Sequence, residues 1–157
     1  MTISFTLNGD QRSLSVAPNE ILLEVLRYRL GIKSAKCGCD QGDCGTCTVL
    51  IDGRTVRSCL VMAVEIDGST VTTLEGLMKN GLTPLQKTFL EHNSFQCGYC
   101  TPGVILSVTE LLGKNPQPDR EIIKAALAGN LCRCTGYLPI IDAVVDLVGT
   151  SNMQQSE

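Results

Sequence analysis

The chain has 157 residues, of which 43% are hydrophobic, nine are cysteine and none is tryptophan. A net charge of −3 with scattered lysines and arginines excludes the basic patch of a nucleic-acid-binding protein. No apolar stretch reaches the roughly 18–20 residues that span a bilayer, and the first residues show no signal peptide, so we expect a cytoplasmic protein. In that reducing compartment, cysteines are better suited to metal binding than to disulfides.

Residues 1–76 are predicted to form a first domain of strands and one helix. Apolar and polar residues alternate on both sides of a turn at residues 8–10, which predicts a β-hairpin. Asn19 is the expected N-cap of an amphipathic helix that ends at Gly31. A second hairpin is predicted from strands 48–51 and 55–58, and a further strand from residues 71–74.

Residues 77–150 are predicted to form a second domain made of helices. Thr83 and Thr101 each precede a proline, a pattern that places an N-cap before a proline at the first helical position. Asp119 is the expected cap of the next helix. Four helices with short connections predict a four-helix bundle, so the expected fold class is α+β. The last residues, 151–157, are predicted to be a frayed tail.

The first group of cysteines lies in a glycine-rich loop. Cys39, Cys44 and Cys47 have the spacing C-x4-C-x2-C, and Cys59 follows after eleven residues. This is the ligand spacing of plant-type ferredoxins, which bind a 2Fe–2S cluster. The glycines let the backbone approach the cluster and offer N–H donors to its sulfur atoms. A zinc site is the alternative, and Cys37 is expected to be a free thiol.

The second group consists of Cys97 and Cys100, separated by two residues, and Cys132 and Cys134, separated by one. Four thiolates suit either a 2Fe–2S cluster or a zinc ion. Cys100 and Cys134 directly precede predicted helix N-termini, which favours an anionic cluster without excluding zinc.

Little else in the sequence could carry out chemistry. His92 is the only histidine and falls at a predicted helix end, and the carboxylates are scattered without a pairing motif. No glycine-rich nucleotide-binding loop is present. These observations predict a protein that transfers electrons for a partner and has no catalytic residues of its own.

Together these motifs resemble the small iron–sulfur subunit of the xanthine oxidase family of molybdenum hydroxylases. The resemblance covers residues 2–148 and departs from the family pattern mainly at Thr46, where alanine is usual. The segments that carry it are residues 36–49, 52–53, 58–60, 73–76, 96–103 and 129–137.

The resemblance implies two 2Fe–2S clusters, one in a ferredoxin-like β-grasp domain and one in a four-helix bundle with pseudo-two-fold symmetry. It also implies a large molybdopterin-binding subunit and a medium FAD-binding subunit as partners. Electrons would pass from molybdenum to the helical-domain cluster, then to the ferredoxin-like cluster and on to FAD. Gln96 and Cys134 occupy the positions that contact the pterin cofactor.

The substrate of such a complex is expected to be an N-heterocycle, a purine or an aldehyde, hydroxylated with oxygen from water. A stand-alone two-cluster ferredoxin and a zinc-binding interaction module are the alternatives. The polar loop around the first cysteine group predicts that its cluster lies nearer the surface. The second cluster is expected to be drier, among apolar helices.

Overall fold

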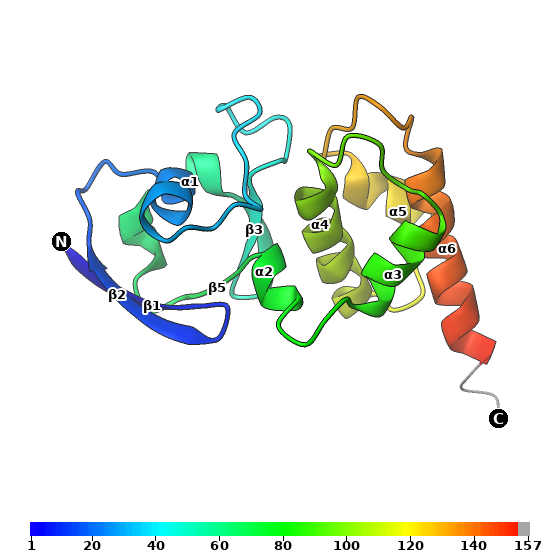
Figure 1. Ribbon diagram of the computed structural model, residues 1–157, viewed down its shortest axis with the longest axis horizontal. Helices are drawn as coiled ribbons and strands as arrows, with labels where there is room; N and C mark the ends of the chain where they lie inside the picture. Colours follow the sequence, from blue (N-terminus) through cyan, green and yellow to red (C-terminus); the bar gives the residue numbers. More distant parts are fainter. Residues whose placement is uncertain (154–157) are drawn as a thin grey trace.

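The computed structural model describes residues 1–153, with side chains described to residue 150, and shows two lobes side by side (Figure 1). One lobe, on the left in Figure 1, contains all the described strands, and the other contains the long helices. The predicted α+β class is therefore confirmed.

A five-stranded sheet forms the first lobe, with strand order β2-β1-β5-β3-β4. β1 pairs with β2 in antiparallel orientation and with β5 in parallel orientation, while β3 pairs antiparallel with both β4 and β5. Both predicted hairpins are therefore confirmed. The strands are β1 (Thr2–Leu7), β2 (Asp10–Ser15), β3 (Thr48–Ile51), β4 (Arg54–Arg57) and β5 (Thr70–Thr72).

The core of the first lobe lies between this sheet and one helix. The helix begins as α1 (Leu22–Glu24) and continues as a π-helical segment, Val25–Arg29. Phe5 on β1 and Leu26 on the helix are completely or almost completely buried. Burial of such a side chain contributes about 1.5–3 kcal/mol, so the alternating pattern of β1 fixes which face of the sheet the helix covers.

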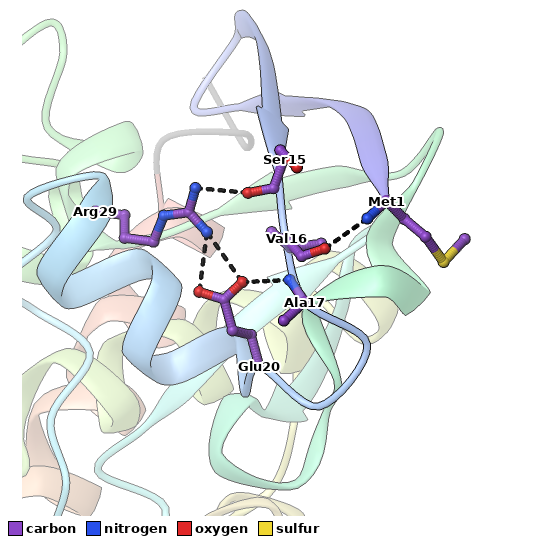
Figure 2. A network of polar contacts seen from close by, with 6 residues as sticks. All are labelled: Met1, Ser15, Val16, Ala17, Glu20 and Arg29. Carbon is purple, nitrogen blue, oxygen red and sulfur yellow. Dashed lines mark hydrogen bonds and ion pairs between the residues drawn. The ribbon is translucent and has the colours of Figure 1, made fainter.

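The sequence predicts Asn19 as the N-cap of this helix, and that prediction is wrong. The cap position is Ile21. Figure 2 shows the neighbouring residue, Glu20, accepting a hydrogen bond from the backbone N–H of Ala17 at 2.6 Å. Its carboxylate also pairs with Arg29 at 2.9 Å. Glu20 thus holds the chain in a turn at the point where the pattern predicted a helix, and the helix begins later.

Short helical segments complete the first lobe and lead out of it. Two single turns of 3-10 helix, Ser58–Leu60 and Ala63–Ile66, follow β4. The first of these carries Cys59, and β4 ends at Arg57, one residue before the predicted end of that strand. After β5, α2 (Leu74–Leu77) leads the chain to the second lobe (Figure 1).

The second lobe consists of α3, α4, α5 and α6, which surround an apolar core. In this lobe α3 contacts α4 and α6, and α5 contacts α4 and α6. The helix bounds are α3 (Pro84–Glu91), α4 (Thr101–Lys114), α5 (Arg120–Leu127) and α6 (Leu138–Met153). The last helix enters the predicted tail, of which residues 154–157 lie outside the described part of the chain. No helix among the described residues is both long enough and apolar enough to cross a membrane.

Two of the three helix caps predicted in the second lobe are confirmed. Thr83 accepts a hydrogen bond from the backbone N–H of Gln86, and Asp119 accepts one from Ile122 at 2.8 Å. Thr101 is not a cap, because α4 begins one residue earlier than predicted and its N-cap is Cys100.

The lobes meet where α4 packs against β3 and β4. Only glycine fits at the centre of this contact: a Cβ on Gly103 would lie 2.3 Å from the carbonyl oxygen of Gly45. Asn130, which is 2% exposed, donates a hydrogen bond to that same carbonyl at 3.2 Å. The side-chain carbonyl of Asn130 accepts a hydrogen bond from the hydroxyl of Ser107 at 2.8 Å. Buried polar groups with satisfied hydrogen bonds fix a single docking geometry.

Candidate metal centre

The first cysteine group forms two contacting pairs at the end of the sheet. The backbone N–H of Cys44 donates to the Sγ atom of Cys39 at 3.3 Å, and the side chains of these two residues also interact. The Sγ atoms of Cys47 and Cys59 lie 3.4 Å apart and are buried. Hydrogen bonds from the backbone N–H of Cys44 and then of Gln41 lower the pKa of Cys39 to about 7, so the loop favours a thiolate at this position.

The glycine-rich loop is shaped around these sulfur atoms. A Cβ on Gly38 would lie 2.8 Å from the Sγ atom of Cys44. Thr46, the departure from the family's alanine, donates its hydroxyl to the carbonyl of Lys36 at 3.0 Å and lies 3.2 Å from the same Sγ atom. The threonine therefore adds a polar contact next to a proposed ligand and displaces none of the cysteines.

The second cysteine group lies where two loops meet at one end of the helices. Cys97 and Cys100 precede α4, and Cys132 and Cys134 lie between α5 and α6. The Sγ atoms of Cys97 and Cys134 are 3.6 Å apart, and the side chains of Cys100 and Cys132 also interact. The hydroxyl of Thr135 lies 3.1 Å from the sulfur of Cys132.

The expected difference in burial is wrong for the chain by itself. In the second group, Cys97 and Cys134 are exposed, whereas no cysteine of the first group is. The reason is geometric: the second group sits in loops at the ends of the helices and not between them. The apolar helices cover only one side of it, and Cys100 is the member they bury.

Two of the thiols favour the neutral, protonated form in the absence of a metal. Burial, together with the neighbouring thiol of Cys47, raises the pKa of Cys59 to about 12. Burial likewise raises the pKa of Cys100 to about 12, with a further contribution from Cys132. A bound metal reverses this preference, because its positive charge stabilises the thiolate.

The donor set fits a 2Fe–2S cluster in each group. Such a cluster is held by four cysteine thiolates on two irons, and each group supplies its four sulfurs as two contacting pairs. The hydroxyl of Thr101, directly after the ligand candidate Cys100, is buried and has no hydrogen-bond partner. A cluster sulfur would provide the missing acceptor. Among the described residues, no three metal-ligating side chains form a site for a single ion.

The structure brings the two groups close to each other. The carbonyl oxygen of Cys44 accepts a hydrogen bond from the backbone N–H of Leu131 at 2.8 Å. Leu131 precedes Cys132 in the chain, so one hydrogen bond joins a loop of the first group to a loop of the second. This contact holds the two cysteine-bearing loops next to each other.

The two predicted pterin-contact residues also lie together. The side-chain amide of Gln96 donates to the carbonyl of Cys134 at 3.2 Å, and both residues are exposed. His92 lies at the C-terminal end of α3 and pairs with Asp146 at 3.0 Å, which confirms its expected place at a helix end. Cys37 is an exposed thiol outside both groups.

Sequence reasoning missed several residues around the two groups. Thr101 was interpreted only as a helix cap, and Asn130 was not singled out. The signal that could have found them is position, because Thr101 directly follows one cysteine and Asn130 lies two residues before another. Lys36 and Tyr99 also lie next to cysteines in the sequence, but that position does not reveal their contact with each other, which joins the two lobes.

Comparison with known proteins agrees with these two sites. Residues 5–74 match the 2Fe-2S iron-sulfur cluster binding domain family, and residues 73–145 match the [2Fe-2S] binding domain family. The nicotinate dehydrogenase small FeS subunit of Eubacterium barkeri is 50% identical over 92% of each chain. The xanthine dehydrogenase iron-sulfur-binding subunit of Escherichia coli O157:H7 is 44% identical over 93% of each.

A solved structure shows the same arrangement of both lobes. Quinoline 2-oxidoreductase from Pseudomonas putida 86 contains a chain that superimposes with a TM-score of 0.92 and 44% identity, covering 98% of this chain and 96% of that one. The chain thus carries two 2Fe–2S binding domains in tandem, and it belongs to the small iron–sulfur subunits of the xanthine oxidase family of molybdenum hydroxylases.

Proposed function

We propose that this chain is the electron-transfer subunit of a multi-subunit molybdenum hydroxylase. It carries electrons from a molybdopterin centre on a large partner subunit, through two 2Fe–2S clusters, to FAD on a medium subunit or to another acceptor. The observation that carries the proposal is the pair of four-cysteine groups on adjoining lobes, joined by the hydrogen bond from Leu131 to Cys44.

The domain and ligand assignments are part of the proposal. Residues 1–76 form a ferredoxin-like β-grasp domain and residues 77–150 a four-helix bundle with pseudo-two-fold symmetry, whose last helix continues to Met153. The strand order and the contacts between the helices support this division. The ligands are Cys39, Cys44, Cys47 and Cys59 for the first cluster and Cys97, Cys100, Cys132 and Cys134 for the second.

The position of Gln96 supports a direction for the electrons. Gln96 and Cys134 form an exposed contact next to the second group, at a surface that a partner can reach. A side-chain amide both donates and accepts hydrogen bonds, which suits the edge of a pterin. The large subunit would therefore dock on this side and cover the exposed cysteines, and the first group would pass electrons onward.

The substrate class follows from the relatives. Nicotinate, xanthine and quinoline, in the names of the three relatives described above, are all N-heterocycles. An N-heterocycle or purine is accordingly the favoured substrate of the whole complex, with an aldehyde as the other class, because a further relative is an aldehyde oxidoreductase. Water supplies the oxygen, and hydroxylation takes place on the large subunit.

Anaerobic purification of the native complex tests the main proposal. Two 2Fe–2S clusters require about four irons per chain, with acid-labile sulfide in equal amount and two EPR signals after reduction. A large partner chain should co-elute in gel filtration. Zinc in place of iron would refute the proposal, and an iron-loaded monomer without partners would indicate a stand-alone ferredoxin.

A variant pair tests the role of Gln96. Gln96→Ala should leave the iron content unchanged and slow the reduction of the second cluster by substrate in a single turnover. Gln41→Ala is the matched control, because Gln41 is an exposed glutamine next to the first group. Equal rates of cluster reduction in both variants and the unmodified complex would remove Gln96 from the path.

A further inference from the structure

Lys36 belongs to the first lobe, but its ammonium group lies at the second cysteine group. Its backbone is held next to β3, where its N–H donates to the carbonyl of Thr46 at 3.0 Å. The side chain crosses to the helical lobe and donates to the carbonyl of Tyr99 at 3.1 Å and of Gly98 at 3.4 Å. These two carbonyls belong to the short loop between Cys97 and Cys100.

Tyr99 fixes the lysine side chain from the other lobe. The ammonium lies 5.1 Å from the centre of the Tyr99 ring, within the range of a cation–π contact. The hydroxyl of Tyr99 in turn donates to the carbonyl of Cys37 at 2.6 Å. Each loop therefore reaches across to the other, and the ammonium is held by several contacts at once.

The charged groups around Lys36 favour its action on the second group. Partial burial lowers the pKa of Lys36, while the nearby sulfurs of Cys100 and Cys97 raise it. Arg27 also lowers this pKa, and Glu75 raises it. The two carbonyls that hold the ammonium lie in the loop between Cys97 and Cys100, so its positive charge is directed towards thiols that we have assigned to the second cluster.

We propose that Lys36 is a positioning residue that raises the reduction potential of the second 2Fe–2S cluster, through an ammonium group that the carbonyls of Gly98 and Tyr99 hold next to it. The inference rests on the proposed function, because it requires a cluster at the second group.

The physical reason is the charge of the reduced state. Reduction adds one electron to the cluster and neither forms nor breaks a bond, so the reduced cluster carries one more negative charge. A fixed cation nearby stabilises that charge, and net charge and hydrogen bonding are among the factors that set cluster potentials. A higher potential at the second cluster makes it a better acceptor for electrons arriving from molybdenum.

Potentiometric titration of the native complex with dithionite, followed by EPR of the two clusters, tests this inference. Lys36→Met keeps an unbranched side chain without the charge, and Lys36→Gln keeps an N–H donor without it. In both variants, the equilibrium constant for reduction of the second cluster should fall roughly three- to tenfold. At 59 mV per tenfold for one electron, its reduction potential should therefore fall by about 30–60 mV. The first cluster should shift less.

Two control variants separate charge from loop packing. Lys36→Arg keeps the charge and should keep the potential of the second cluster. Tyr99→Phe removes the hydrogen bond to Cys37 without a change of charge. It should change the equilibrium constant for reduction of the second cluster by less than about twofold, which corresponds to a shift in its potential of less than about 20 mV.

Several results would overturn the assignment of Lys36. These are an unshifted second cluster in the neutral variants, an equal shift of both clusters, or loss of the second cluster in both neutral variants but not in Lys36→Arg. The last result would mean that the positive charge of Lys36 is needed to assemble the second cluster and does not set its reduction potential. Absence of two cluster signals in the unmodified complex would refute the proposed function instead.

Discussion

Gly103 offers a direct test of how tightly the two lobes are docked. It lies in the first turn of α4, where alanine is preferred over glycine by about 1 kcal/mol on helix propensity alone. Yet a Cβ at this position would lie 2.3 Å from the carbonyl oxygen of Gly45 and 2.9 Å from the side-chain amide of Asn130. Two opposing effects therefore act on Gly103→Ala.

The contact across the lobes should dominate. The atom that the new methyl group meets is backbone, and Gly45 is itself held from the other side, since a Cβ on it would lie 2.3 Å from the carbonyl of Gly129. Overpacking of a rigid contact costs about 1–3 kcal/mol, and this geometry favours the upper value. After the helix preference is subtracted, Gly103→Ala should destabilise the protein by about 2 kcal/mol.

Thermal unfolding of the iron-loaded chain at pH 7, followed by far-UV circular dichroism, measures this effect. For a chain of this size, 1 kcal/mol corresponds to about 2–4 °C in Tm, so Gly103→Ala should lower Tm by about 4–8 °C. Gly113→Ala is the matched control, because Gly113 lies in the same helix with open space around it. It should leave Tm unchanged or raise it. A Tm for Gly103→Ala equal to or above that of the control would refute the close approach of the lobes.

Three further predictions concern single side chains. Partial burial opposes ionisation of Glu75, but hydrogen bonds, first from the Ser34 hydroxyl, lower its pKa to about 2 from its usual 4.5. Glu75→Gln should therefore destabilise the protein by about 1 kcal/mol at pH 7. The difference in Tm between this variant and the unmodified protein should shrink only as the pH falls below about 4.5. A difference that instead grew in acid would have the wrong sign. Thr101→Val removes a buried hydroxyl that has no protein partner and that would donate to a cluster sulfur. In a potentiometric titration followed by EPR, it should shift the reduction potential of the second cluster and leave that of the first unchanged. Potentials identical to those of the unmodified complex would show that Thr101 does not contact the cluster. Cys37→Ser should retain all bound iron in an iron assay, whereas Cys39→Ser should lose the first cluster; iron loss in Cys37→Ser would exchange the two assignments.

The sequence by itself determined the features that depend on neighbours along the chain. The spacing of Cys39 and Cys44 places both in one loop, and the structure brings them into contact. Thr83 and Asp119 cap their helices as predicted, because a cap needs only a side chain and the next turn of backbone. Asn19 and Thr101 were the exceptions. The longer-range pair of Glu20 with Arg29 holds the turn at Asn19, and α4 begins one residue early, so that Cys100 takes the cap position in place of Thr101.

Only the tertiary structure decided how the lobes act on each other. Tyr99 and the carbonyl of Cys37 are 62 positions apart in the chain, and the ammonium of Lys36 meets Gly98 across the same distance in sequence. It also decided that Cys134 is exposed, which the surrounding apolar helices had seemed to exclude. No local pattern encodes such contacts, because they depend on the close approach of two separately folded surfaces, and that approach is set by the missing side chain of Gly103 and the buried amide of Asn130.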